Sequence, residues 1–184
     1  MHIQPSFIIH SSSSPDRDDV VKMLQEKTGA EVIEAVWIPN DPKKGCRESH
    51  KKVAALAKEK YPDSSYLVFE DDCELVSDRW FWPTVAGDTV DLIYLGVNGY
   101  GTFFGDMYSY GTHAMIVNPK MRDLILDKTD EYVDRVWEKG AFDHILNKLC
   151  YDNDMTVWRP TEKDKERWVR QKKGLTSTIT GNIR

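Results

Sequence analysis

This chain of 184 residues lacks several features, and each absence excludes a class of protein. No apolar run approaches the ~18 residues that a membrane-spanning helix needs. The three cysteines, Cys46, Cys73 and Cys150, are odd in number and widely spaced, so they match neither a disulfide framework nor a zinc pattern. The formal net charge of −5 argues against a nucleic-acid binder that relies on a broad basic surface.

The composition that remains is typical of a soluble globular protein with one domain. Hydrophobic residues make up 40% of the chain and charged residues 30%, which is enough apolar material for a single core. We expect one domain over residues 1–160, followed by a charged, partly mobile tail over residues 161–184. Because Met1–Pro5 begins no signal peptide and cysteine is scarce, we expect the protein to remain in the cytosol.

Strand-like and helix-like segments alternate along the chain. Apolar runs predict strands, helical spacing of apolar residues predicts helices, and residues 40–45 and 98–111 are expected to be loops. The predicted strands cover residues 3–10, 31–38, 66–69, 92–96, 114–117 and 155–158, and the predicted helices cover 14–28, 48–60, a segment from 119, and 141–150. This order is typical of an α/β fold with a mostly parallel sheet and helices on both faces.

Three consecutive acids follow the most strongly apolar strand. Glu70, Asp71 and Asp72 come directly after the run Tyr66–Phe69. Acids cannot lie inside a strand buried on both faces, so we expect them at its carboxyl end, where ligands bind in open α/β sheets. Carboxylate oxygens suit Mg²⁺ or Mn²⁺, so the motif predicts a metal site; a solvated acidic turn is the alternative.

Two other segments are expected at the same edge of the sheet, because helices in such units run antiparallel to their strands. The serine-rich turn from Ser11 to Arg17 offers hydroxyls, backbone N–H groups and a guanidinium, which can hold a uracil, ribose or phosphate. It matches neither the glycine-rich dinucleotide fingerprint nor a Walker loop. The alternative interpretation is a simple turn with a capped helix.

The second segment is the start of the predicted helix over residues 48–60. Cys46, His50, Val53 and Ala57 are spaced to form one helical stripe, so His50 should point inward near the cleft. His50 either fills a structural role or orients the acids or a phosphate by hydrogen bonding. Cys46 is expected to pack rather than act as a nucleophile, since no base is spaced to activate it.

Further candidates lie in the second half of the chain. Asp143 lies in the first turn of a predicted helix, where it either interacts with the helix dipole or serves as a general base. The segment 98–111 is rich in glycine, tyrosine and phenylalanine, and its aromatic side chains suit stacking on sugar rings.

Together these motifs resemble glycosyltransferase family 25, the lipopolysaccharide and collagen galactosyltransferase group. The resemblance rests on Gly45-Cys46 with Ser49-His50, followed about one helix later by Val68–Asp72. Arg17 matches an arginine expected after the first strand, and residues 91–96 and 111–114 are similar to later segments of that family. The chain is shorter than typical members, and its acceptor loop is compact.

The resemblance implies a GT-A-like fold and a metal-dependent transfer, with inversion, from a nucleotide sugar, with UDP the expected nucleotide. It implies a DXD-type site in which Asp72 is the main Mn²⁺ (or Mg²⁺) ligand beside Glu70 and Asp71, and in which Asp143 is the general base. Residues expected to bind the nucleotide sugar are His10, Ser11, Arg17, Ser49, His50, Glu70 and Asp71, and those expected at the acceptor are Tyr110, Gly111, Thr112 and His113.

The acceptor is expected to be a hydroxyl on a glycan, lipid-linked sugar or protein, in a microbial cell or the cytosol of a virus-infected host. One alternative is a sugar-1-phosphate nucleotidyltransferase, although the serine-rich turn poorly supplies the glycine-rich phosphate loop that such enzymes use. The other alternative is a non-catalytic sugar- or protein-binding domain that has kept the fold.

Overall fold

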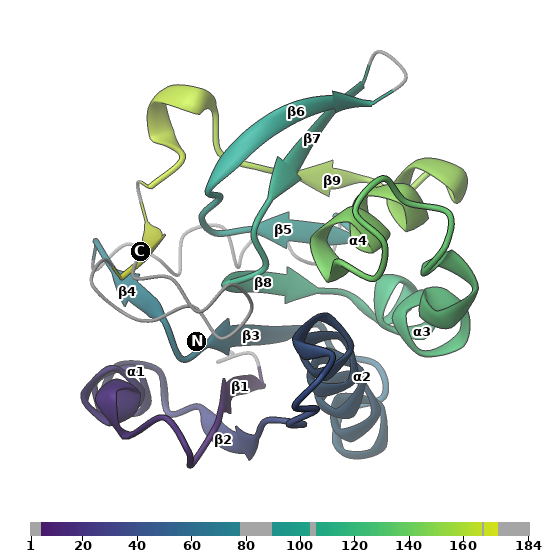
Figure 1. Ribbon diagram of the computed structural model, residues 1–184. Helices are drawn as coiled ribbons and strands as arrows, with labels where there is room; N and C mark the ends of the chain where they lie inside the picture. The colour runs from purple at the N-terminus through teal and green to yellow at the C-terminus, as the bar shows by residue number, and fades with distance from the viewer. Residues whose placement is uncertain (1–4, 78–89, 104–105, 167, 173–184) are drawn as a thin grey trace.

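The computed structural model describes residues 5–77, 90–103, 106–166 and 168–172. Its centre is a six-stranded sheet (Figure 1). In spatial order the strands are β2 (Glu31–Glu34), β1 (Ser6–His10), β3 (Tyr66–Glu70), β8 (Ala114–Val117), β5 (Leu92–Tyr94) and β9 (Val157–Trp158). Only β8 pairs antiparallel with its neighbours, which confirms the predicted, mostly parallel α/β sheet.

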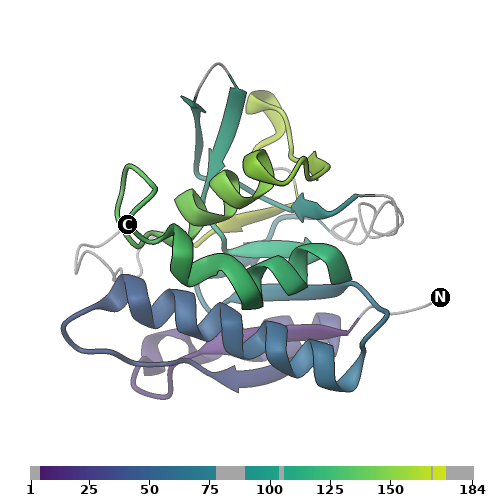
Figure 2. The ribbon, with the colours of Figure 1, turned by 90° about the vertical axis from the view of Figure 1, so that its right-hand side faces the viewer.

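Alternate strand residues face opposite sides of the sheet and build two separate cores. Tyr66 and Val68 of β3 pack in the core that includes Val53 of α2 (Pro42–Lys60). Leu67 and Phe69 pack on the other side with Leu24 of α1 (Asp18–Thr28). Figures 1 and 2 show α2, α3 (Pro119–Lys128) and α4 (Phe142–Asp152) layered over one face, with α1 on the other.

Capping residues explain where α1 ends and where α2 begins. α1 ends at Thr28, as predicted, and Gly29 follows in the left-handed region at φ 68°, which glycine adopts without strain. A short 3-10 turn, η1 (Pro15–Arg17), precedes α1, and Ser14 makes no side-chain capping bond there. The prediction that α2 begins at residue 48 was wrong: the Asp41 side chain accepts a hydrogen bond from the Lys44 N–H, and Pro42 opens the helix.

The segment expected to be an irregular loop is instead a β-hairpin. β6 (Gly99–Phe103) pairs antiparallel with β7 (Asp106–Tyr110), and the pair rises from the sheet edge in Figure 1. The prediction failed because glycine disfavours strands and interrupts the sequence pattern of this segment. Its aromatic residues favour strands, since they fit a pleated surface.

Part of the segment expected to be a tail is built into the fold. In this segment, β10 (Val169–Gln171) pairs antiparallel with β4 (Cys73–Leu75). Two further 3-10 helices come earlier in the chain: η3 (Thr129–Tyr132) before α4, and η4 (Glu162–Asp164) before β10. Trp168 and Val169 are buried in the core on the α1 side. A Cβ on Gly96 would lie 2.0 Å from the Val169 carbonyl oxygen, so the chain after β5 passes this strand too closely for any side chain.

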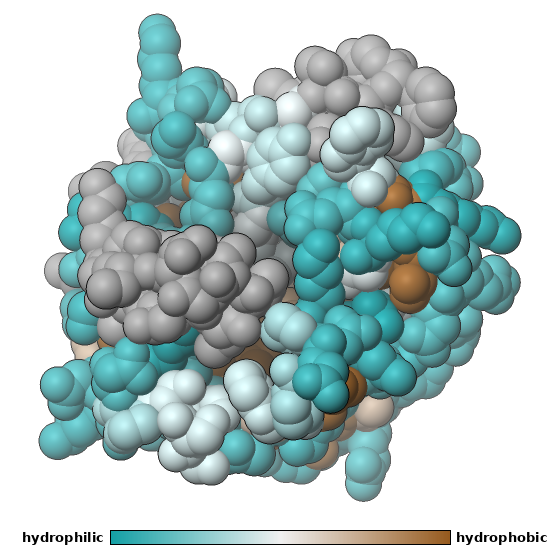
Figure 3. Space-filling view, in the orientation of Figure 1, coloured by the Kyte–Doolittle hydropathy of each residue, from teal (hydrophilic) through white to brown (hydrophobic). Residues whose placement is uncertain are grey.

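The domain boundary proposed at residue 160 stays a prediction. The described residues exclude the end of the expected tail, residues 173–184, and the aromatic run Trp80–Trp82. Where the chain is described, none of its helices has both the length and the apolar character to span a bilayer. The surface in Figure 3 is mainly hydrophilic, with small hydrophobic areas between polar side chains.

Candidate functional site

Two pockets meet at the carboxyl end of β3. The first lies between the start of α1, the chain after β2, and α2. The second lies between α2, residues 110–113 at and beyond the end of β7, and the start of α4. Cys46, Glu70 and Gln171 line both pockets. The carboxyl edge of the sheet therefore carries two adjoining pockets, as expected for the ligand-binding edge of an α/β fold.

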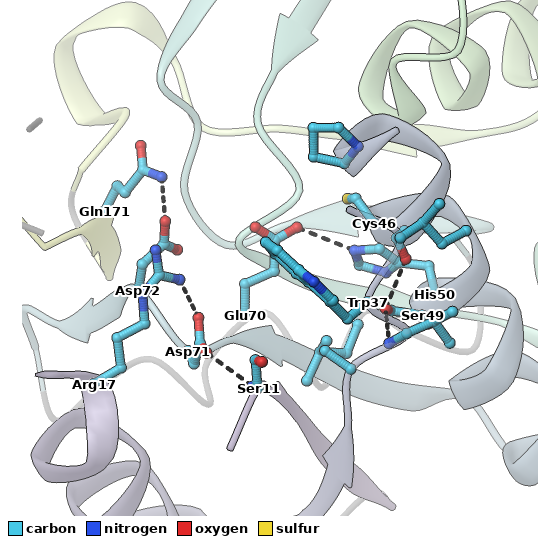
Figure 4. Close-up of a pocket in the computed structure, with 16 residues that line it drawn as sticks. Ser11, Arg17, Trp37, Cys46, Ser49, His50, Glu70, Asp71, Asp72 and Gln171 are labelled. Atoms are coloured by element: carbon cyan, nitrogen blue, oxygen red, sulfur yellow. Dashed lines mark hydrogen bonds and ion pairs between the residues drawn. The ribbon is translucent and has the colours of Figure 1, made fainter. Parts of the chain in front are cut away.

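The three consecutive acids at this edge point in different directions (Figure 4). Glu70 Oε1 accepts hydrogen bonds from His50 Nε2 at 3.0 Å and from the Thr112 hydroxyl at 2.5 Å. Burial works to raise the pKa of Glu70, but the hydrogen bond and charge of His50 and the bond from Thr112 outweigh it and lower the pKa. Glu70 is thus an ionised carboxylate held between α2 and the segment after β7.

Asp71 is committed to an internal ion pair. Its Oδ1 accepts a hydrogen bond from the Arg17 guanidinium, and its Oδ2 accepts from His10 Nδ1 at 2.9 Å and from the Ser11 N–H at 3.3 Å. Only 4% of Arg17 and 6% of Asp71 is exposed. The pair therefore ties η1 to the turn after β3. His10, which also contacts Asp18, lines neither of the two pockets.

Asp72 alone among the three acids keeps a buried oxygen without a hydrogen-bond partner in the described residues. Its Oδ2 accepts a hydrogen bond from Gln171 Nε2 at 2.5 Å, while Oδ1 has none. Burial and then the charge of Glu70 raise the pKa of Asp72 to about 6. A buried carboxylate oxygen without a partner is costly, so this position favours a proton, a water or a cation.

The first pocket is shaped by close packing between the start of α2 and the chain after β2. The Ser49 hydroxyl donates to the Gly45 carbonyl and accepts from the Val36 N–H, both at 2.8 Å. A Cβ on Gly45 would lie 2.7 Å from the Val36 carbonyl oxygen, so glycine permits this approach. Ser49 thus positions the pocket wall, while Trp37, 57% exposed, offers an aromatic face in the same pocket.

The second pocket presents Asp143 in the first turn of α4. Asp143 Oδ2 accepts a hydrogen bond from the Gly111 N–H at 3.1 Å, and Oδ1 accepts from the His144 N–H at 2.9 Å. Gly111 has φ 99°, a conformation that favours glycine. The half-buried carboxylate is thereby oriented by backbone groups on two sides.

Most residues named from the sequence line the two pockets. In the first are Ser11, Arg17, Ser49, His50, Glu70, Asp71 and Asp72; in the second are Glu70, Tyr110, Gly111, Thr112, His113 and Asp143. Sequence reasoning missed Trp37 and Gln171. Trp37 could have been identified, because a tryptophan close to Pro39 at the end of a predicted strand indicates an exposed aromatic at the ligand-binding edge. No feature of the neighbouring sequence indicates that Gln171 reaches the site.

The thiol of Cys46 also faces this edge. Burial, and then the charges of Glu70 and Asp143, raise its pKa well above the ordinary value. A thiol that resists ionisation is a poor nucleophile, and Cys46 packs against the core on the α2 side of the sheet, as predicted.

Comparison with known proteins gives a fold but no family. No protein-family model matches the chain, and no curated protein matches it. The crystal structure of a glycosyltransferase involved in the glycosylation of the major capsid of PBCV-1 aligns with a TM-score of 0.55 at 10% identity, covering 84% of this chain and 80% of that chain. This likeness shows a GT-A-like fold.

Two weaker likenesses are the inositol-1-phosphate CTP transferase from T. maritima and the glycosyltransferase GlyE from Streptococcus pneumoniae TIGR4. The first has a TM-score of 0.48 at 11% identity, covering 86% of this chain and 85% of that one. The second has a TM-score of 0.45 at 13% identity, covering 85% of this chain and 38% of that one.

Proposed function

We propose that this chain is a metal-dependent glycosyltransferase that moves a sugar from a nucleotide sugar to a hydroxyl acceptor, with inversion. The observation that carries the proposal is the buried Asp72 Oδ1, which lacks a hydrogen-bond partner in the described residues, at the junction of two pockets. Adjoining pockets suit a reaction between two substrates, and the GT-A-like fold is compatible with it.

The first pocket is the proposed donor site. Trp37 offers a face on which a nucleobase stacks, and Asp72 lies in the same pocket as the proposed ligand of Mn²⁺ or Mg²⁺. When bound there, the cation supplies positive charge that offsets the charge developing on the departing nucleotide diphosphate. UDP is the proposed nucleotide, on the resemblance of the sequence motifs.

The neighbouring acids have supporting roles in this proposal. Asp71 holds Arg17 and keeps the turn after β3 in place, so that Asp72 faces the pocket. Glu70, fixed by His50 and Thr112, adds negative charge at the junction of the pockets and thereby favours a cation near Asp72.

The second pocket is the proposed acceptor site, with Asp143 as the general base. A carboxylate whose oxygens accept two backbone hydrogen bonds is held in one orientation and retains lone pairs for a substrate hydroxyl. A base on the acceptor side activates that hydroxyl for attack on the face of the sugar opposite the leaving nucleotide, which is the arrangement that inversion requires. The acceptor is a hydroxyl of a glycan, lipid-linked sugar or protein.

The first experiment is a calorimetric titration of UDP and a panel of UDP- and GDP-sugars, with Mn²⁺ and with EDTA. We expect Mn²⁺ to tighten nucleotide binding in the wild type, and we expect Asp72→Asn to abolish that tightening while leaving the protein folded. Glu31→Gln is the matched control, because Glu31 is an exposed acid at the opposite, amino end of β2.

Nucleotide binding that is equally tight with Mn²⁺ and EDTA, or unchanged in Asp72→Asn, contradicts the metal role of Asp72. Absence of any nucleotide binding refutes the donor site and favours a non-catalytic binding domain. The sugar nucleotide that binds best then serves as donor in an acceptor screen, with release of free nucleotide diphosphate as the readout of transfer.

A further inference from the structure

One cluster at the site combines a thiol, an imidazole and a carboxylate. Cys46 and His50 are four residues apart on α2, so their side chains lie on the same helical face. Glu70 reaches them from the end of β3, and one ligand atom from each of the three residues lies within 4.8 Å of the other two. Figure 4 shows Glu70 pointing toward His50, and Cys46 lies next to His50 on α2.

We propose that Cys46, His50 and Glu70 form a binding site for a thiophilic divalent cation, for which Zn²⁺ is the best fit. Thiolate and imidazole ligands favour Zn²⁺ over Mg²⁺ and Mn²⁺, and three protein ligands with one open position are typical of exchangeable or catalytic zinc. The site is chemically different from Asp72, which offers only oxygen, and it does not rest on the proposed function.

The spacing of His50 and Glu70 is close to what one tetrahedral ion requires, and a Cys46 ligand atom lies within 4.8 Å of both. His50 Nε2 and Glu70 Oε1 are 3.0 Å apart. Ligand atoms on a tetrahedral Zn²⁺ are separated by roughly 3.3–3.6 Å, given bond lengths of about 2.0–2.3 Å. A small side-chain rotation therefore replaces the hydrogen bond between His50 and Glu70 by two bonds to one ion. The thiol proton of Cys46 is released to solvent as the ion binds.

The surroundings hold these ligands in place. The Thr112 hydroxyl donates to Glu70 Oε1, and the His50 ring stacks on Phe142 at a centroid distance of 4.5 Å. Such outer contacts orient ligand side chains around a metal. Because Cys46 and Glu70 line both pockets, an ion held by them would be within reach of a water or a substrate oxygen as its fourth ligand.

The test uses the full chain, freed of metal by a chelator and titrated with Co²⁺ as a spectroscopic substitute for Zn²⁺. We expect a near-ultraviolet thiolate-to-cobalt charge-transfer band that saturates at one thiolate-bound Co²⁺ per chain, with the visible bands of tetrahedral Co²⁺; Co²⁺ held by oxygen at Asp72 gives no such charge-transfer band. Cys46→Ser should abolish the charge-transfer band, and His50→Gln should weaken it. Glu31→Gln is the control and should retain the band, since Glu31 is an exposed acid at the amino end of β2 and is not among the three ligands.

A second measurement needs no variant. Iodoacetamide alkylation of Cys46, followed by mass spectrometry, should become about tenfold slower at a Zn²⁺ concentration about ten times the dissociation constant, because only the free state reacts. The same concentration of Mg²⁺ should leave the rate unchanged. A charge-transfer band that persists in Cys46→Ser, the absence of the band in the wild type, or equal alkylation rates with Zn²⁺ and Mg²⁺ overturns the proposal.

Discussion

Replacing Arg17 by methionine tests whether this arginine holds the fold together or contacts a ligand. The substitution keeps most of the side-chain volume and removes the charge that faces Asp71. Because 4% of Arg17 and 6% of Asp71 is exposed, the remaining carboxylate is left buried with less compensation. Breaking a buried pair by removing one partner costs about 3–5 kcal/mol.

The structure places the expected loss at the lower end of that range. Asp71 keeps its hydrogen bonds from His10 Nδ1 and from the Ser11 N–H, which continue to stabilise the carboxylate. We therefore expect Arg17→Met to lower the free energy of unfolding by about 3 kcal/mol. For a chain of this length that corresponds to a decrease in the melting temperature of roughly 6–12 °C.

Urea unfolding followed by circular dichroism measures the effect as a lower midpoint with an unchanged slope. Lys60→Met is the matched control: it breaks the exposed pair between Lys60 and Glu31 and should leave the midpoint nearly unchanged. Adding Asp71→Asn to Arg17→Met removes the uncompensated charge and should restore part of the lost stability.

Two outcomes refute this reasoning. The first is an Arg17→Met protein whose free energy of unfolding equals that of Lys60→Met. If that protein also loses nucleotide binding, Arg17 contacts the ligand instead of stabilising the fold. The second is a double variant with Asp71→Asn whose loss equals the sum of the two single losses, because uncoupled losses show that the buried pair is not a unit.

Three further predictions concern the pockets and the docking of β10. Trp37→Ala should weaken nucleotide binding by about five- to 150-fold in a calorimetric titration, since base stacking contributes about 1–3 kcal/mol. Trp137→Ala, at an exposed tryptophan that lines neither pocket, is the control, and equal affinities of Trp37→Ala and the wild type contradict the stacking role. Asp143→Asn should lower the rate of sugar transfer by about 10²–10⁴-fold without changing nucleotide affinity, and a rate near that of the wild type excludes Asp143 as the base. Gly96→Ala should destabilise the protein by about 1–3 kcal/mol in urea unfolding, because its Cβ would lie 2.0 Å from a β10 carbonyl oxygen. Gly99→Ala, whose Cβ would meet nothing closer than 3.6 Å, is the control for Gly96, and equal losses would show that β10 does not dock as described.

The predicted strands were found because their signal is local. A run such as Tyr66–Phe69 is apolar at every position, so its burial on both faces follows from its own residues. The start of α2 was missed, although Asp41 and Pro42 form a recognisable capping pair, because the lysines that follow resemble a loop. The β6–β7 hairpin was missed because its stability comes from pairing between two glycine-containing segments, not from either one alone.

The location of the candidate site and most of its lining residues were predictable, whereas the hydrogen-bond partners of its acids were not. Strand order and helix direction bring the segments around Ser11, Cys46 and Glu70 to one edge, because these features follow from the alternation of strands and helices. Gln171 could not be anticipated, since the pairing of β10 with β4 joins residues about a hundred positions apart.

What the sequence by itself determined is the fold class, the edge of the sheet that carries the acids, and the inward face of α2, because each depends on local hydrophobic pattern and chain direction. Only the tertiary structure decided which partner each acid has: Glu70 turns to His50, Asp71 to Arg17, and Asp72 to Gln171. Adjacent residues at the end of a strand diverge in space, so their environments are set by segments distant in the chain. For this reason three consecutive acids that the sequence presents as one motif have different partners and different proposed roles.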